Sequence, residues 1–250
     1  MQNVNNYGQL CTEMYERLHE VAPSDELGFY LSYARKDERV LEALCGSGRF
    51  LIPFLDAGHR IEGIDSSPQM LEKLKAKRPN APATRIDIAT LPPDGTFDYI
   101  FITSGSVSLF TNSDSLRKMF ANIRSALDPK GTFVFAVDTV ACAEPDDEDY
   151  RITASVTIDD RHKLTLKTKN RFDARTNTQY SPGIYELLED GRPIKVEHMD
   201  FQTHLFSFGE LDEVLDAAGF EISGVFSSFD KKPATGNDDA MFLYECRPKA

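Results

Sequence analysis

The chain has 250 residues, 41% hydrophobic and 27% charged, which is the balance of an ordinary globular protein with one large domain or one domain and an insertion. No uninterrupted hydrophobic run exceeds five residues, which excludes a membrane-spanning helix, and the net charge of −12 argues against a nucleic-acid partner. The first residues lack a basic segment followed by an apolar one, so we expect no signal peptide and a cytoplasmic location.

Strand and helix patterns alternate through the first half of the chain. Hydrophobic periodicity predicts helices over residues 8–22, 25–35, 50–58, 67–77 and 114–127, and strands over residues 39–44, 60–64, 97–102 and 132–138. This alternation indicates an α/β fold with a mostly parallel sheet that helices cover on both faces.

A run of five acids within residues 144–149 separates this half from the next, and we interpret it as a solvated, mobile linker. After it, apolar and polar residues alternate with a period of two, which predicts antiparallel strands up to Phe206. A capping-box pattern at Ser207 then predicts a helix, followed by two strands over 220–229 and 240–247. We therefore expect three segments: N-terminal helices and an α/β core over 1–149, an antiparallel lid over 150–206, and a last helix and two strands that complete the core sheet over 207–250.

The cysteines and histidines show no pattern of a metal site or a disulfide framework. The four cysteines are spread over the chain without a C-x-x-C pair, and the five histidines include no H-E-x-x-H spacing. We expect reduced thiols and no metal ion.

A glycine-containing turn after the first strand is the most informative stretch. Gly46 and Gly48 stand where residues 39–44 turn into a helix, at the carboxyl edge of the expected sheet, where a ligand can approach the backbone closely. Asp65 ends the second strand, 17 residues after Gly48, and a carboxylate there can accept both hydroxyls of a ribose. This acid suits NAD or another adenosine ligand. Leu51 occupies the third glycine slot of a dinucleotide fingerprint, which disfavours NAD.

Five ordered motifs resemble the class I S-adenosylmethionine-dependent methyltransferases. Residues 42–49 match the D/E-x-G-x-G-x-G motif, and residues 64–71 match the second motif around its acid. Asp87 with Leu91-Pro92, residues 97–100 and residues 127–132 match the later motifs. The resemblance implies a Rossmann-like, seven-stranded, mostly parallel sheet, S-adenosylmethionine as the cofactor, S-adenosylhomocysteine as its product, and a small-molecule methyl acceptor.

The resemblance also implies residue roles. Glu42 would bind the ammonium group of the cofactor, Asp65 its ribose hydroxyls, and Met70 would lie on the adenine, whose edge Asp87 and the Ile88 amide would read. The full set of cofactor contacts expected is Tyr15, Tyr30, Glu42, Gly46, Gly48, Arg49, Asp65, Ser66, Met70, Asp87, Ile88 and Ser104.

The chain departs from the family pattern at two places. Leu44 replaces the first glycine of the motif, so we expect Cys45, Gly46 and Gly48 to make the turn. Ser108 stands where sugar N-methyltransferases often carry His or Tyr, which removes an obvious base. Candidate catalytic residues that would act on the acceptor are Ser108, Asp138 and the lid histidines His198 and His204. The two histidines are an even number of residues apart, so we expect them to share one face of a strand.

Three functions stay open at this level. The first is methyl transfer to N or O of a small molecule. The second is cofactor binding without catalysis, and the third is NAD-dependent oxidation. Neither the acceptor nor the oligomeric state follows from the sequence.

Overall fold

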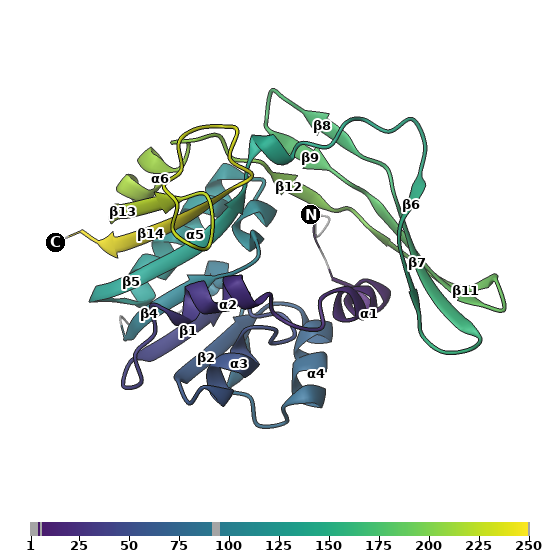
Figure 1. Ribbon diagram of the computed structural model, residues 1–250, viewed down its shortest axis with the longest axis horizontal. Helices are drawn as coiled ribbons and strands as arrows, with labels where there is room; N and C mark the ends of the chain where they lie inside the picture. Colours follow the sequence, from purple (N-terminus) through teal and green to yellow (C-terminus); the bar gives the residue numbers. More distant parts are fainter. Residues whose placement is uncertain (1–4, 6, 92–95, 250) are drawn as a thin grey trace. The chain divides into compact units, whose positions relative to one another are not determined.

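The computed structural model describes residues 5, 7–91 and 96–249 (Figure 1). The chain forms two compact units. The α/β unit comprises Ala22–Cys142 and Leu205–Ala250, and the antiparallel unit comprises Met1–Val21 and Ala143–His204. This division corrects the expected segments, because the first helix belongs with the antiparallel strands and not with the core. Within the described ranges, no helix is both long and apolar enough to span a membrane.

A seven-stranded sheet forms the centre of the α/β unit, in the order β13-β14-β5-β4-β1-β2-β3. Strands β1 to β5 pair in parallel, and β14 pairs antiparallel with both β5 and β13. The strands are β1 (Arg39–Ala43), β2 (Arg60–Asp65), β3 (Ala83–Arg85), β4 (Phe97–Ile102), β5 (Leu127–Asp138), β13 (Phe220–Phe226) and β14 (Met241–Pro248). The mostly parallel α/β sheet expected from the sequence is therefore confirmed.

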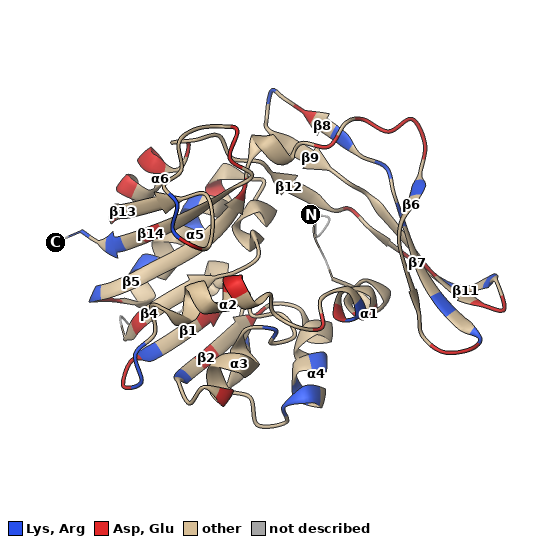
Figure 2. Cartoon of the chain, viewed as in Figure 1, with Lys and Arg blue, Asp and Glu red and all other residues tan. Residues whose placement is uncertain are grey.

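Helices cover both faces of this sheet, each over its own apolar cluster. Phe29 and Phe54 of α2 and α3 contribute to one cluster, and Phe120 and Leu215 of α5 and α6 contribute to the other. The helices are α2 (Ser24–Leu31), α3 (Leu51–Asp56), α4 (Pro68–Lys77), α5 (Ser113–Ala126) and α6 (Asp212–Ala217), with short 3₁₀ helices η1 (Ile88–Thr90), η2 (Ser106–Leu109) and η3 (Val140–Cys142). Figure 2 shows the basic C-terminal end of α4, where the positive charges of the lysines interact favourably with the negative end of the helix dipole.

Two elements of the α/β unit differ from the expectation. No strand is predicted at β3, because this strand is only three residues long and two of the three are exposed, so it lacks the buried run that marks a strand. Strand β5 begins at Leu127, earlier than expected, because Leu127 pairs with Phe97 before a register shift around the proline and glycine of the turn.

Two smaller sheets and one helix form the antiparallel unit. Its elements are α1 (Gln9–Leu18), β6 (Arg151–Thr157), β7 (His162–Thr168), β8 (Arg171–Asp173), β9 (Thr178–Tyr180), β10 (Gly183–Glu189), β11 (Arg192–Met199) and β12 (Gln202–His204). The four-stranded sheet has the order β11-β10-β7-β6, and the three-stranded sheet has the order β12-β9-β8. The antiparallel strands expected from the period of two are present.

Helix α1 packs on one face of the four-stranded sheet. Its Leu10, Cys11 and Met14 are buried with side chains of β7, β10 and β11. Glu197 of β11 accepts hydrogen bonds from the backbone N–H groups of Leu10 and Cys11, at 3.0 and 3.1 Å. The carboxylate therefore accepts hydrogen bonds from first-turn amides to which no N-cap side chain bonds. Its negative charge also interacts favourably with the positive end of the helix dipole.

The acidic stretch, red in Figure 2, is hydrogen-bonded within the antiparallel unit and is not the free linker expected from its composition. Asp146 accepts from the Phe172 backbone N–H at 2.8 Å, and Asp147 accepts from the Asn170 backbone N–H at 2.9 Å. Asp147 also forms an ion pair with Arg151 at 3.0 Å. These acids serve as acceptors for a turn that lies more than twenty residues further along the chain, which composition alone does not reveal.

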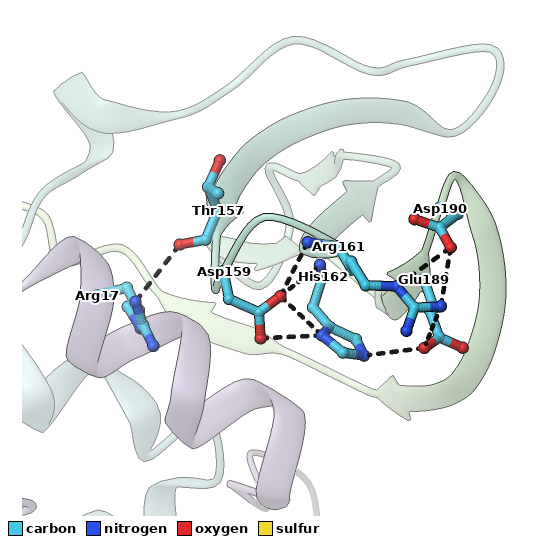
Figure 3. A network of polar contacts seen from close by, with 7 residues as sticks. All are labelled: Arg17, Thr157, Asp159, Arg161, His162, Glu189 and Asp190. Atoms are coloured by element: carbon cyan, nitrogen blue, oxygen red, sulfur yellow. Dashed lines mark hydrogen bonds and ion pairs between the residues drawn. The ribbon is translucent and has the colours of Figure 1, made fainter.

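A second set of ion pairs joins the tips of two hairpins in the same unit (Figure 3). The His162 ring contacts Asp159 at 2.8 Å and Glu189 at 3.6 Å, while Arg161 pairs with Glu189 and Asp190 at 3.1 and 3.0 Å. Pairs this exposed contribute little to the stability of the fold.

Candidate functional site

The glycine turn after β1 is built on three left-handed residues. Leu44 has φ +60°, Gly46 has φ +53° and Gly48 has φ +82°. Leu44 therefore takes the conformation that the missing glycine would take, which corrects the expectation that Cys45, Gly46 and Gly48 make the turn. A non-glycine residue in this region costs on the order of 1–2 kcal/mol, so the surrounding structure stabilises a strained turn here.

The two glycines have different surroundings. A Cβ atom on Gly48 would lie 2.4 Å from Leu74 Cδ1, so the helix α4 packs where a side chain would be. A Cβ atom on Gly46 would meet only Met70 Sδ, at 4.0 Å. The structure thus requires Gly48 for packing within the protein and leaves space beside Gly46, as close approach of a ligand to the backbone needs.

Glu42, in β1, is almost completely buried, with 1% of its surface exposed. Its carboxylate contacts the Leu51 backbone N–H, but its Oε2 atom is buried without a hydrogen-bond partner among the described residues. Burial raises the pKa of Glu42 well above its usual value, and the nearby Asp65 carboxylate raises it further. A buried acceptor without a donor costs about 1–3 kcal/mol, so this oxygen suits a ligand with a positively charged hydrogen-bond donor.

Asp65 joins the glycine turn to the start of α4. Its Oδ2 accepts from the Gly46 backbone N–H, and its Oδ1 accepts from the Ser67 backbone N–H, both at 2.8 Å. Burial raises the pKa of Asp65, against the lowering effect of these amides. The Ser67 hydroxyl accepts from the Met70 backbone N–H at 3.2 Å, so the N-cap of α4 holds the buried Met70 beside Gly46.

The short helix η1 follows β3, the strand that pairs with β2. Asp87 is exposed and caps η1 by accepting from the Ala89 backbone N–H at 2.9 Å, while Ile88 is buried. Ser66, exposed beyond β2, has its carbonyl bonded to Arg85 at 3.2 Å. Pro92, the last residue of the third motif, lies outside the described residues.

Glu26 is the site residue that the sequence did not indicate. Its Oε1 accepts from the Ser104 backbone N–H at 2.9 Å and from the Ser104 hydroxyl at 3.3 Å, and the Arg49 guanidinium also donates to that hydroxyl. Burial raises the pKa of Glu26, whereas the Ser104 contacts and the Arg49 charge lower it. Ser104 has φ +58°, a strained conformation directly after β4 that these bonds maintain. In the sequence, Glu26 is an ordinary acid in the first turn of a helix.

Tyr30, a predicted cofactor contact, and Ser108, a candidate for work on the acceptor, have hydrogen-bond partners within the protein. Tyr30 is fully buried, and its hydroxyl donates to the Ile102 carbonyl at 3.1 Å. Ser108 is also fully buried, and its hydroxyl accepts from the Asp138 backbone N–H at 2.9 Å. The structure therefore gives Tyr30 a packing role and makes Ser108 an anchor for the end of β5.

Asp138 is the last residue of β5 and is partly exposed. Its carboxylate lies against Gly105, where a Cβ atom would be 2.7 Å from Asp138 Oδ1. Burial raises the pKa of Asp138 to about 6. A carboxylate with this pKa changes charge close to neutral pH and can accept a proton there.

The predicted histidine pair is split between two strands. The chain leaves the sheet at Asp200 and Phe201, so His198 lies on β11 of the four-stranded sheet and His204 ends β12 of the three-stranded sheet. His198 is exposed on the face opposite to α1. The expectation that both histidines share one face is therefore wrong. The remaining candidate, Tyr15 on α1, packs against His19 in the antiparallel unit, with ring centroids 4.8 Å apart and ring planes tilted by 49°.

Comparison with known proteins gives one family match. The family described as a methyltransferase domain matches residues 40–131, which include the glycine turn, Asp65 and Asp87. A protein of Bacillus subtilis with the name "Putative methyltransferase YqeM" is 25% identical over 129 residues. This match covers 50% of the chain and 52% of YqeM, so the chain matches about half the length of that curated relative.

Solved structures share the fold along almost the whole chain. The CcbJ methyltransferase of Streptomyces caelestis has a TM-score of 0.73 at 20% identity and covers 98% of this chain and 100% of its own. A S-adenosylmethionine-dependent methyltransferase of Clostridium acetobutylicum has a TM-score of 0.77 at 16% identity, covering 95% and 97%. The sugar N-methyltransferase KedS8 of a Streptoalloteichus species has a TM-score of 0.71 at 15% identity, covering 95% and 92%. At these identities the likeness is one of fold.

Proposed function

We propose that the chain, which matches a methyltransferase domain over residues 40–131, transfers a methyl group from S-adenosylmethionine to a nitrogen or oxygen atom of a small molecule. The observation that carries the proposal is the unpartnered, buried Oε2 of Glu42 at the same turn as the open space beside Gly46. The sugar N-methyltransferase among the solved relatives supports a small-molecule acceptor.

The charges at the end of β1 suit this cofactor. Glu26, Glu42 and Asp65 are three carboxylates whose pKa values are raised by burial, and Arg49 is the cation that lowers those of Glu26 and Glu42. S-adenosylmethionine carries a sulfonium, an ammonium and a carboxylate. We assign the ammonium to Glu42 and the carboxylate to Arg49, so that the cationic ligand offsets the surplus of buried negative charge.

The adenosine half would lie along the ends of the next two strands. Asp65 keeps acceptor capacity beyond its two amide bonds for the ribose hydroxyls, since an ionised carboxylate has about four lone-pair sites. Met70 would contact the adenine, and Asp87 with the Ile88 amide would read the adenine edge. Ser66, Gly48 and Ser104 would shape the walls of the site.

When bound, the cofactor would supply a methyl group activated by its sulfonium, which passes to an in-line nucleophile while S-adenosylhomocysteine leaves. The chain then has to orient the acceptor, exclude water and take up a proton if the nucleophile carries one. We assign the proton to Asp138 Oδ, because Asp138 ends β5 and its pKa of about 6 leaves it ionised at neutral pH. Ser104 and Ser106 are the neighbouring hydroxyls that could orient an acceptor.

Two measurements test this function. Calorimetry should show binding of S-adenosylmethionine and S-adenosylhomocysteine and no comparable binding of NAD. A screen of acceptors with labelled cofactor should then find methyl transfer. NAD binding without adenosylmethionine binding would overturn the assignment, whereas cofactor binding without transfer to any acceptor would reduce the protein to a cofactor-binding one.

A further inference from the structure

A cavity of about 570 Å³ lies within the antiparallel unit. Met14 and Tyr15 of α1 form one wall, and Leu166, Thr168, Tyr185 and Met199 of the four-stranded sheet form the facing wall. Every residue that lines it belongs to this one unit. The volume is within the range of roughly 300–1,000 Å³ that is typical of small-molecule sites.

The walls of the cavity favour a flat apolar ring. Tyr15 is flanked by Tyr7 at 6.3 Å with nearly perpendicular rings and by His19 at 4.8 Å, so the α1 wall presents a row of rings. Tyr185 and Met199 on the facing wall are buried. Aromatic rings and thioethers both make favourable contacts with the rings of aromatic ligands.

The polar groups on the rim favour a ligand without charge. Arg151 lines the cavity, but its guanidinium already forms ion pairs with Asp147 at 3.0 Å and Glu144 at 3.7 Å. An anion would have to compete with both carboxylates, and a cation would have to displace Arg151 from them. A neutral hydroxyl or amide avoids both costs and can bond to the hydroxyls of Thr153 and Thr168, which lie 3.2 Å apart.

We propose that this cavity binds an uncharged small molecule with an aromatic or similarly flat apolar ring. The site is formed by the antiparallel unit alone, so it can be tested without cofactor.

The test uses three ligands that share one ring and differ in charge: benzyl alcohol, benzoate and benzylamine. They are titrated into the full-length, cofactor-free protein with methyl-labelled methionines, and the signals of Met14 and Met199 are followed. Benzyl alcohol should shift both signals, and the two charged ligands should bind at least about fivefold more weakly, because each buries a charge without a free partner. Equal or tighter binding of benzoate or benzylamine would overturn the uncharged class.

Two matched variants locate the site. Thr168→Leu adds volume on the cavity face of β7 and should abolish binding of benzyl alcohol. Ser155→Leu adds the same side chain on the opposite face, since Ser155 pairs with Thr165, and should leave binding unchanged. Wild-type binding in Thr168→Leu would overturn the site. If that variant does not fold, Tyr15→Leu removes one ring and should weaken binding at least about threefold, and unchanged binding there would overturn it equally.

Calorimetry with S-adenosylhomocysteine on the same samples separates the two proposals. If wild-type protein binds S-adenosylhomocysteine but no benzyl alcohol, the cavity inference fails alone. If it binds no S-adenosylhomocysteine, the proposed function fails, whatever the ring ligands do.

Discussion

Replacing Glu42 with Gln should weaken cofactor binding and change how the stability of the cofactor-free protein depends on pH. The substitution keeps the size of the side chain and removes a charge that is buried beside Asp65, Glu26 and Arg49. Hydrogen bonds to charged groups are worth about 1.5–3 kcal/mol. The dissociation constant of S-adenosylhomocysteine should therefore rise by roughly 10- to 150-fold at neutral pH.

The pH dependence follows from the direction of the pKa shift. Burial raises the pKa of Glu42 in the folded state, so between its ordinary and its raised pKa the folded protein binds more protons than the unfolded chain. The free energy of unfolding of the cofactor-free wild type should fall as pH rises through this window, by up to about 1.4 kcal/mol per pH unit for one whole proton. Glu42→Gln removes this contribution, so its stability should fall less steeply.

Calorimetry and chemical denaturation between pH 5 and pH 9 measure both effects. Glu62→Gln is the matched control, because Glu62 lies on the adjacent strand β2 but is half exposed and pairs with Arg39 at the surface. It should bind the cofactor like wild type and change stability by less than about 1 kcal/mol. The reasoning is refuted if Glu42→Gln binds S-adenosylhomocysteine as tightly as wild type, or if its stability follows the wild-type pH dependence.

Three further changes test the rest of the site. Gly48→Ala should destabilise the fold by about 2–4 kcal/mol, because Leu74 fills the space that the new methyl group would need. Gly46→Ala should cost only about 1 kcal/mol of stability but should weaken cofactor binding. Chemical denaturation measures the first effect and calorimetry the second, and equal losses of stability in the two variants would contradict the different surroundings of the two glycines. Asp65→Ala should raise the cofactor dissociation constant at least about tenfold, and wild-type affinity by calorimetry would mean the ribose lies elsewhere. Asp138→Asn should stabilise the protein above pH 6, by up to about 3 kcal/mol, with the gain vanishing below pH 4 where both states are protonated; a gain that persists in acid would rule out titration of Asp138 as its cause.

The sequence alone determined the alternation of strands and helices, the glycine turn and the acids that follow it. These features are local, because the period of apolar residues and the turn residues depend on neighbours within a few positions. They placed Glu42 in β1 and Asp65 at the end of β2, and parallel pairing then brings these carboxyl ends to one edge of the sheet. The fold class and the resemblance to the methyltransferase family follow from that pattern.

Only the tertiary structure decided which side chains at that edge already have partners. Glu26 meets Ser104 across 78 residues of sequence, and no local pattern marks it. No local pattern marks Ser108 either, whose hydroxyl accepts a hydrogen bond from the Asp138 backbone N–H. The acidic stretch likewise accepts a hydrogen bond from the backbone of a turn that is distant in the sequence. The split of residues 194–206 between two sheets depends on pairing with β9 and β10. A hydrogen bond or a strand pair depends on where distant segments pack, and that packing is set by the whole chain.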